Sequence, residues 1–166
     1  MVRARHRTSR TVPFMHGSVT VHMNATPDAV WRVVSDVTRV GEFSPETFEA
    51  EWLDGGTGPA AGARFRGHVK RNGRGPTYWT VCDVVACVPE REFAFAVVNR
   101  GKPINTWTYR LEPAAGGTDV TESFRLTDTA LLRAYWALAG RWRSKTNDAN
   151  MRTTLQKMKA VVERAS

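Results

Sequence analysis

Cysteine and histidine are scarce in this chain of 166 residues, which holds two of the first and four of the second. The two cysteines, Cys82 and Cys87, stand five residues apart within one predicted strand, so they cannot bridge without breaking that strand. Their spacing is not C-x-x-C, and the nearest histidine in sequence, His68, lies fourteen residues before Cys82. We therefore predict free thiols and no metal site.

Long apolar runs are also missing. No uninterrupted run reaches the length of about 18 residues that a membrane-spanning helix needs. The first fifteen residues carry four arginines with no apolar stretch behind them, which does not fit a secretory signal, so we predict a cytoplasmic protein. A chain of this length buries roughly 70% of the surface that its unfolded form exposes, and one core can hold it without disulfides or metals.

Positive charge is in excess, with a formal net charge of +8. Half of this excess comes from Arg3, Arg5, Arg7 and Arg10, and no basic run or mixture of basic and aromatic residues follows them. We therefore predict a solvated basic surface and no nucleic-acid partner. Residues 1–15 have no apolar period and are predicted to form a disordered basic tail before a single domain over residues 16–166.

Apolar spacing indicates the first secondary-structure elements. Apolar and polar residues alternate over residues 16–23, which predicts a half-buried strand. Thr26 can cap the helix that follows, and Pro27 suits its first turn. We predict this helix over residues 27–36 and a short second one over residues 38–43.

Six further extended segments are separated by short turns, and they cover residues 47–53, 63–71, 77–87, 92–98, 104–112 and 118–126. Connections this short require antiparallel neighbours, so we expect a meander that the first strand joins at an edge. An apolar series at helical spacing then predicts one helix of more than thirty residues across the concave face of the curved, seven-stranded sheet. The series is Leu131, Leu132, Tyr135, Leu138, Ala139, Trp142, Met151, Leu155, Met158 and Val162. The predicted fold class is α+β.

Several local blocks carry a family resemblance. Residues 25–31 read ATPDAVW and residues 35–45 read SDVTRVGEFSP, with support from Trp52, from GARF at residues 62–65, from Trp79 and from GGT at residues 116–118. In these blocks the chain resembles the polyketide cyclase/dehydrase and lipid-transport family of the START and Bet v 1-like (SRPBCC) superfamily. The resemblance implies a helix-grip fold with a hydrophobic cavity between sheet and long helix. It also implies apolar ligands and, for some members, cyclase or aromatase activity, but no catalytic signature that the whole superfamily shares.

Alternation along the strands predicts which side chains face this cavity. One face is unusually aromatic, whereas the other carries Arg64, Arg66, His68 and Arg110 and belongs in water. With two aromatic residues of the long helix, the expected ligand contacts are Phe65, Val69, Trp79, Val81, Phe95, Val97, Asn99, Trp107, Tyr109, Glu122, Phe124, Tyr135 and Trp142. Ordinary core packing is the alternative for any single aromatic among them.

Glu122 and Tyr109 are the candidate catalytic residues. Glu122 stands between two apolar residues of the inner face, where loss of hydration tends to raise a carboxyl pKa and suits the group to proton transfer. The alternatives are that Glu122 pairs with an arginine of the long helix or lies at the open end of the cavity. Every histidine falls on the outward face or in or beside the tail, so we expect no nucleophilic triad, no metal and no cofactor.

The segment between the short helices and the second strand is the candidate gate, with Phe43, Ser44 and Glu46 as its residues. We predict a binding protein for a hydrophobic, lipid- or polyketide-like small molecule. A polyketide cyclase, aromatase or dehydratase that uses the same cavity is the alternative, and a protein-interaction module that uses the convex basic face is a third. An apolar cavity selects by shape, so the sequence leaves the ligand and the oligomeric state open.

Overall fold

The computed structural model describes residues 16–165, except for the side chains of residues 72, 130–133, 135–137, 139–143 and 165. The predicted tail over residues 1–15 lies outside this part. The elements in chain order are β1 (His16–Met23), α1 (Pro27–Val34), the 3-10 helix η1 (Val37–Arg39), α2 (Val40–Phe43), β2 (Thr47–Trp52), β3 (Arg64–Val69), the 3-10 helix η2 (Arg71–Gly73), β4 (Tyr78–Val88), β5 (Glu92–Asn99), β6 (Lys102–Ala114), β7 (Gly117–Leu126) and α3 (Ala130–Ala165).

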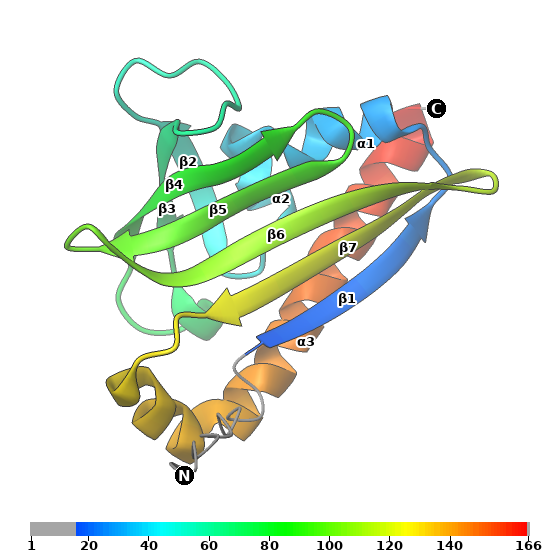
Figure 1. Ribbon diagram of the computed structural model, residues 1–166. Helices are drawn as coiled ribbons and strands as arrows, with labels where there is room; N and C mark the ends of the chain where they lie inside the picture. Colours follow the sequence, from blue (N-terminus) through cyan, green and yellow to red (C-terminus); the bar gives the residue numbers. More distant parts are fainter. Residues whose placement is uncertain (1–15, 166) are drawn as a thin grey trace, which may run out of the picture.

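The seven strands form one antiparallel sheet in the order β1-β7-β6-β5-β4-β3-β2. Strands β2 to β7 are the predicted meander, and β1 joins it at the edge beside β7, also as predicted. Figure 1 shows the curved sheet in front of α3, which runs diagonally behind β7 and β1, while α1 and α2 lie behind the other strands. This arrangement is the helix-grip fold, and it leaves the concave face of the sheet turned toward the helices.

Local sequence determines where α1 begins and ends. The Thr26 hydroxyl accepts a hydrogen bond from the backbone N–H of Ala29, and the proline after Thr26 needs no such partner. The helix ends two residues before the predicted limit because Asp36 caps η1 instead, its carboxylate accepting from the backbone N–H of Thr38 at 3.1 Å. The apolar side of α1 is buried through Val30, Val33 and Val34.

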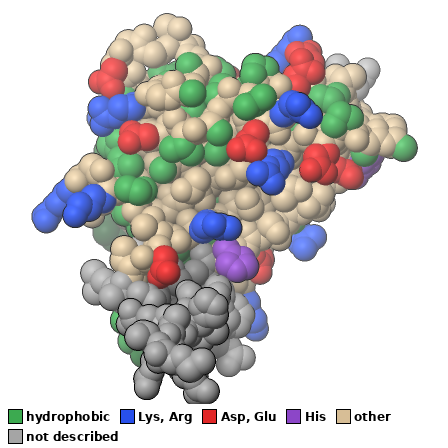
Figure 2. Space-filling view, in the orientation of Figure 1, with side chains coloured by type: hydrophobic (Ala, Val, Ile, Leu, Met, Phe, Trp, Pro, Cys, Tyr) green, Lys and Arg blue, Asp and Glu red, His purple; other side chains and the backbone are tan. Residues whose placement is uncertain are grey.

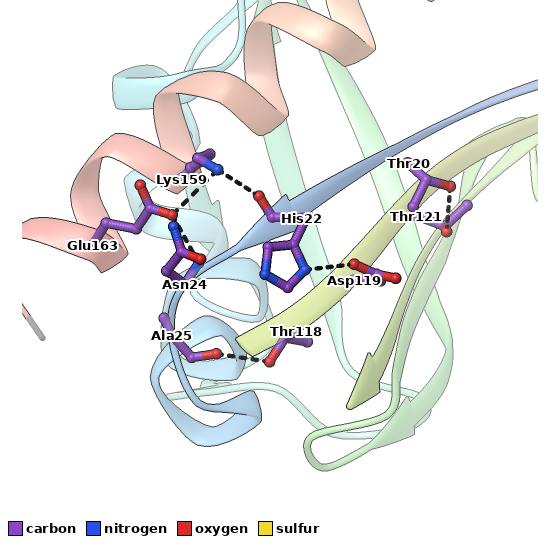
Figure 3. Close-up of polar contacts among 9 residues, drawn as sticks. All are labelled: Thr20, His22, Asn24, Ala25, Thr118, Asp119, Thr121, Lys159 and Glu163. Carbon is purple, nitrogen blue, oxygen red and sulfur yellow. Dashed lines mark hydrogen bonds and ion pairs between the residues drawn. The ribbon is translucent and has the colours of Figure 1, made fainter. Parts of the chain in front are cut away.

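The C-terminal half of α3 is fastened to the end of β1 (Figure 3). Lys159 donates to the backbone oxygen of His22 at 2.7 Å, and Glu163 accepts from the backbone N–H of Asn24 at 2.7 Å. The backbone hydrogen bond from Asn24 holds the pKa of Glu163 below its ordinary value. These contacts place one apolar side of the helix in the core, where its buried members are Met151, Leu155, Met158 and Val162.

The predicted apolar stripe does not run the whole length of α3. Leu138, one of its predicted members, is 91% exposed, so that part of the prediction is wrong. A helix of 36 residues is about 54 Å long, whereas the ten residues of β7 span about 33 Å, and the helix therefore outruns the sheet at its N-terminal end (Figure 1). The side chains of Tyr135 and Trp142 lie outside the described part of the chain.

The face of the sheet turned away from α3 carries both signs of charge. Figure 2 shows Lys and Arg side chains interspersed with Asp, Glu and apolar ones on this side of the molecule. Arg110 pairs with Glu92 at 3.0 Å, and Arg64 pairs with Asp54 at 3.2 Å. The described part of this face is therefore mixed in charge rather than uniformly basic. Within residues 16–165, no helix is both long enough and apolar enough to cross a membrane.

Candidate functional site

A cavity of about 370 Å³ lies between the concave face of the sheet and the helices. Strands β2 to β7 supply its walls on one side, and α1, η1, α2 and α3 lie on the other. Its volume falls in the range of about 300 to 1,000 Å³ that is usual for small-molecule sites. Most of the lining is apolar, and it includes Val33, Val34, Val37, Phe43, Phe65, Val69, Phe93, Phe95, Val97, Ile104, Trp107, Met151 and Met158.

Aromatic rings on alternate positions of three strands form much of this wall. The rings of Phe65 and Phe95 pack edge to face with centroids 5.1 Å apart, and Phe93 lies 6.1 Å from Phe95. Of the predicted ligand contacts, the ones that line the cavity are Phe65, Val69, Phe95, Val97, Trp107, Tyr109 and Glu122. Phe124 is buried on the same face but packs against Trp107, at 5.5 Å between ring centroids, and it does not line the cavity.

Tyr109 and Glu122 form a buried polar pair in the cavity wall. They face each other directly across β6 and β7, and they are 8% and 4% exposed. The Tyr109 hydroxyl donates a hydrogen bond to Glu122 Oε1 at 2.9 Å. Burial raises the pKa of Glu122 to about 8 against the opposing effect of this hydrogen bond, and burial together with the neighbouring carboxyl raises the pKa of Tyr109 well above its ordinary value of 10. At neutral pH both groups are therefore mainly uncharged.

The second carboxyl oxygen of Glu122, Oε2, is buried and has no hydrogen-bond partner among the described residues. The sequence left two other roles open for Glu122, a pair with an arginine of the long helix and a place at the open end of the cavity. The hydrogen-bond partner of Glu122 is Tyr109, and no described arginine pairs with it. A side chain that is 4% exposed also does not lie at an open end. Glu122 is thus a lining residue that has one carboxyl oxygen without a described hydrogen-bond partner.

The predicted facing of β4 is wrong by one residue. The register with β3 pairs Phe65 with Cys82 and Gly67 with Thr80, so the even-numbered residues of this part of β4 share the inner face. Tyr78, Thr80 and Cys82 line the cavity, whereas Trp79 and Val81 do not. Burial raises the pKa of the Cys82 thiol to about 12, so this group is an inert wall rather than a nucleophile.

Trp79 lies on the outer face of the sheet, where its ring packs against polar side chains. It is 41% exposed, stacks on the His68 ring at 4.4 Å and lies 4.4 Å from the Arg66 guanidinium. His68, in turn, contacts Glu49 at 2.6 Å, which confirms its predicted outward position. Asn99 is also misplaced by the prediction, because the register shifts after Val97 and leaves it exposed at the end of β5.

The candidate gate residues Phe43, Ser44 and Glu46 all line the cavity. Phe43 is fully buried, and the Ser44 hydroxyl accepts from the backbone N–H groups of Glu46 at 3.2 Å and Thr47 at 3.0 Å. Ser44 therefore ends α2 and shapes the turn into β2, which places Phe43 against the cavity. A gating role for this segment stays a prediction.

Several lining residues escaped the sequence analysis. The helices contribute Val33, Val34, Met151, Thr154 and Met158. Met151 and Met158 stand seven residues apart on one side of α3 and belong to the predicted apolar stripe, but the expected ligand contacts on this helix were Tyr135 and Trp142. In the part of the chain that the structure describes, no three His, Cys, Asp or Glu side chains gather as a metal site would require.

Comparisons with known proteins agree with this geometry. Residues 15–163 match the family described as polyketide cyclase/dehydrase and lipid transport. A polyketide-cyclase-like protein from Corynebacterium glutamicum is 26% identical, with 91% of this chain and 90% of that one covered and a TM-score of 0.56. A protein from Mycobacterium smegmatis is 15% identical, with 95% and 97% covered and a TM-score of 0.62.

The di-domain ARO/CYC protein StfQ of the steffimycin biosynthetic pathway has the same fold, with 14% identity and a TM-score of 0.72. The match covers 91% of this chain and 51% of StfQ, so this chain corresponds to about half of that protein. No curated protein was found to match. The match over residues 15–163, together with the helix-grip fold, shows that the chain belongs to the polyketide cyclase/dehydrase and lipid-transport family.

Proposed function

We propose that this protein binds one hydrophobic small molecule, lipid- or polyketide-like, in the cavity between the sheet and α3. The observation that carries the proposal is the cavity of about 370 Å³ with aromatic and aliphatic walls. Protein interiors are normally packed to a density that leaves few voids larger than a water molecule. A space of this size therefore favours an occupant.

The chemistry of the walls favours an apolar occupant over bulk water. The Phe65, Phe95 and Trp107 rings offer water few hydrogen bonds, and an apolar ligand that covers them removes that surface from water. The family to which the chain belongs is described by lipid transport as well as by polyketide cyclisation, which is consistent with such a ligand.

A second candidate function, that of a polyketide cyclase, aromatase or dehydratase, is favoured by the Tyr109–Glu122 pair. A buried carboxyl that is still protonated near neutral pH can donate its proton to a substrate carbonyl oxygen. The resulting carboxylate can then take a proton from the carbon beside that carbonyl, which returns the carboxyl to its starting state and leaves the substrate as an enol. Ligand binding is common to both candidates, and proton transfer distinguishes them.

Native mass spectrometry of the freshly purified protein, followed by organic extraction, tests the binding proposal. We expect one small apolar compound per chain, released on denaturation. A protein that carries no compound and also takes up no apolar compound added at micromolar concentration would contradict the proposal.

The enzyme candidate needs a separate assay. Incubation of a poly-ketone substrate with the wild type and with Glu122→Gln separates the two functions, because glutamine keeps the shape of the side chain but cannot release a proton. Turnover by the wild type that Glu122→Gln abolishes would select the enzyme. Binding without turnover would select the binding protein.

A further inference from the structure

Two buried polar atoms in the cavity wall have no hydrogen-bond partner among the described residues. They are Glu122 Oε2 on β7 and Asn105 Oδ1 on β6. Both residues line the cavity, and neither atom meets another described polar group. A buried polar atom without a partner costs stability, so atoms of this kind in a cavity wall indicate where a ligand completes the site.

The two atoms require different hydrogen-bond partners. Glu122 Oε1 already accepts from Tyr109, which leaves the carboxyl O–H at Oε2 free to donate to an acceptor such as a ketone oxygen. Asn105 Oδ1 is a carbonyl oxygen and can only accept, so its partner must carry an O–H or N–H group. The cavity therefore has a donor at one place and an acceptor at another.

The separation of these atoms follows from the sheet. Glu122 is paired with Tyr109, and Asn105 stands four residues before Tyr109 on the same face of β6. Four residues of a strand span about 13 Å, and side chains that converge over a concave face shorten this distance somewhat. Trp107 lies between them on the same face and offers an apolar surface to the middle of a ligand.

Few charged residues line the cavity. Apart from Glu122, the charged residues in the lining are Asp36, Glu46 and Arg71, which come from the segments before η1 and β2 and from η2. No described cation pairs with Glu122 Oε2 or Asn105 Oδ1, so an anionic group at these atoms would be buried without a paired counter-ion.

On the basis of the proposed function, we infer that the ligand is an elongated, uncharged molecule with a hydrogen-bond acceptor at one end and a hydroxyl or amine donor at the other. Glu122 holds the acceptor, Asn105 holds the donor, and the apolar middle of the molecule lies against Trp107. A hydroxylated aromatic ketone belongs to this class, whereas a fatty acid anion does not.

Four rigid biphenyl probes test this inference: 4-acetyl-4′-hydroxybiphenyl, 4-acetylbiphenyl, 4-hydroxybiphenyl and biphenyl. Their dissociation constants are measured by quenching of tryptophan fluorescence for the wild type and for Glu122→Met, Glu122→Gln and Asn105→Leu. Glu122→Gln is the matched control because its amide still donates a hydrogen bond. Circular dichroism and thermal melting establish that each variant is folded.

For the wild type we expect the ketone and the hydroxyl each to strengthen binding about tenfold. Glu122→Met should abolish the gain from the ketone and keep the gain from the hydroxyl, Asn105→Leu should do the reverse, and Glu122→Gln should keep both. Equal affinity of the wild type for all four probes would overturn the inference while leaving the binding function intact. If no probe bound the wild type at all, the proposed function would fail and the inference with it. The comparison of probes on the wild type is decisive even if a variant does not fold.

Discussion

Replacing Glu122 by glutamine should change how the stability of the protein depends on pH. Glutamine has the same shape as the protonated carboxyl, accepts the same hydrogen bond from Tyr109 and cannot ionise. The carboxyl is nearly fully buried, and burial raises its pKa from 4.5 to about 8. The substitution therefore removes one proton equilibrium and leaves the packing of the cavity wall nearly unchanged.

The sign of the effect follows from the two pKa values. Between pH 4.5 and about 8 the unfolded chain has lost this proton while the folded protein keeps it, so the unfolded state binds fewer protons. The free energy of unfolding of the wild type therefore falls as pH rises through this window, by at most about 1.4 kcal/mol per pH unit. Below the window the carboxyl is neutral in both states and the contribution is fully present.

Urea unfolding at pH 5 and at pH 7.5 measures this dependence. Between pH 5 and pH 7.5 the free energy of unfolding of Glu122→Gln should rise relative to that of the wild type by about 3 kcal/mol. Tyr109 stays uncharged throughout, and the charged lining residues Asp36, Glu46 and Arg71 are common to both proteins, so their contributions largely cancel in the difference. A difference between the two proteins that did not change with pH would show that Glu122 does not have a raised pKa in the folded protein.

Three further experiments test the packing. Trp107→Ala should lower the free energy of unfolding by about 3 kcal/mol in urea melts, whereas Trp79→Ala on the outer face should cost clearly less; equal losses would place both rings on one face. Gly41→Ala should lower the melting temperature because the added Cβ would meet a carbonyl oxygen of β2, while Gly58→Ala, with open space around it, should not. Equal melting temperatures of the two variants would show that α2 does not pack closely against β2. Iodoacetamide at pH 8 should modify Cys82 only after denaturation, and rapid labelling of Cys82 itself in the native protein, located by peptide mass spectrometry apart from the partly buried Cys87, would contradict the burial of this thiol.

Most of the fold could be predicted from local patterns, because turn residues and apolar periods are properties of short segments. The strand over residues 16–23 has the predicted limits, and Thr26 caps the following helix as expected. The edge position of β1 followed from the short connections of the meander, which leave no room for it elsewhere. The facing of β4 failed because it depends on the register with β3, and register is a contact between distant segments. Trp79 reinforced the error, since an aromatic ring suggests a core position.

The site was predictable only in part. Glu122 and Tyr109 could be assigned to the inner face from alternation, but the hydrogen bond between them depends on the pairing of β6 with β7. The lining by Thr80 was missed because β4 was assigned the opposite face. The course of α3 beyond the sheet, with Leu138 exposed, reflects the relative lengths of helix and strands, which no local pattern reports.

Titration with Nile red, a neutral dye that fluoresces in apolar surroundings, measures whether an apolar molecule occupies the cavity. We expect the dye fluorescence to saturate at one dye per wild-type chain. Val97 lines the cavity, so Val97→Phe should fill part of it and abolish the fluorescence signal. Val85→Phe, the same change at a position that is 53% exposed, should keep the signal. If Val97→Phe left dye binding unchanged, or if the folded wild type bound no dye, binding of an apolar molecule in this cavity would be contradicted.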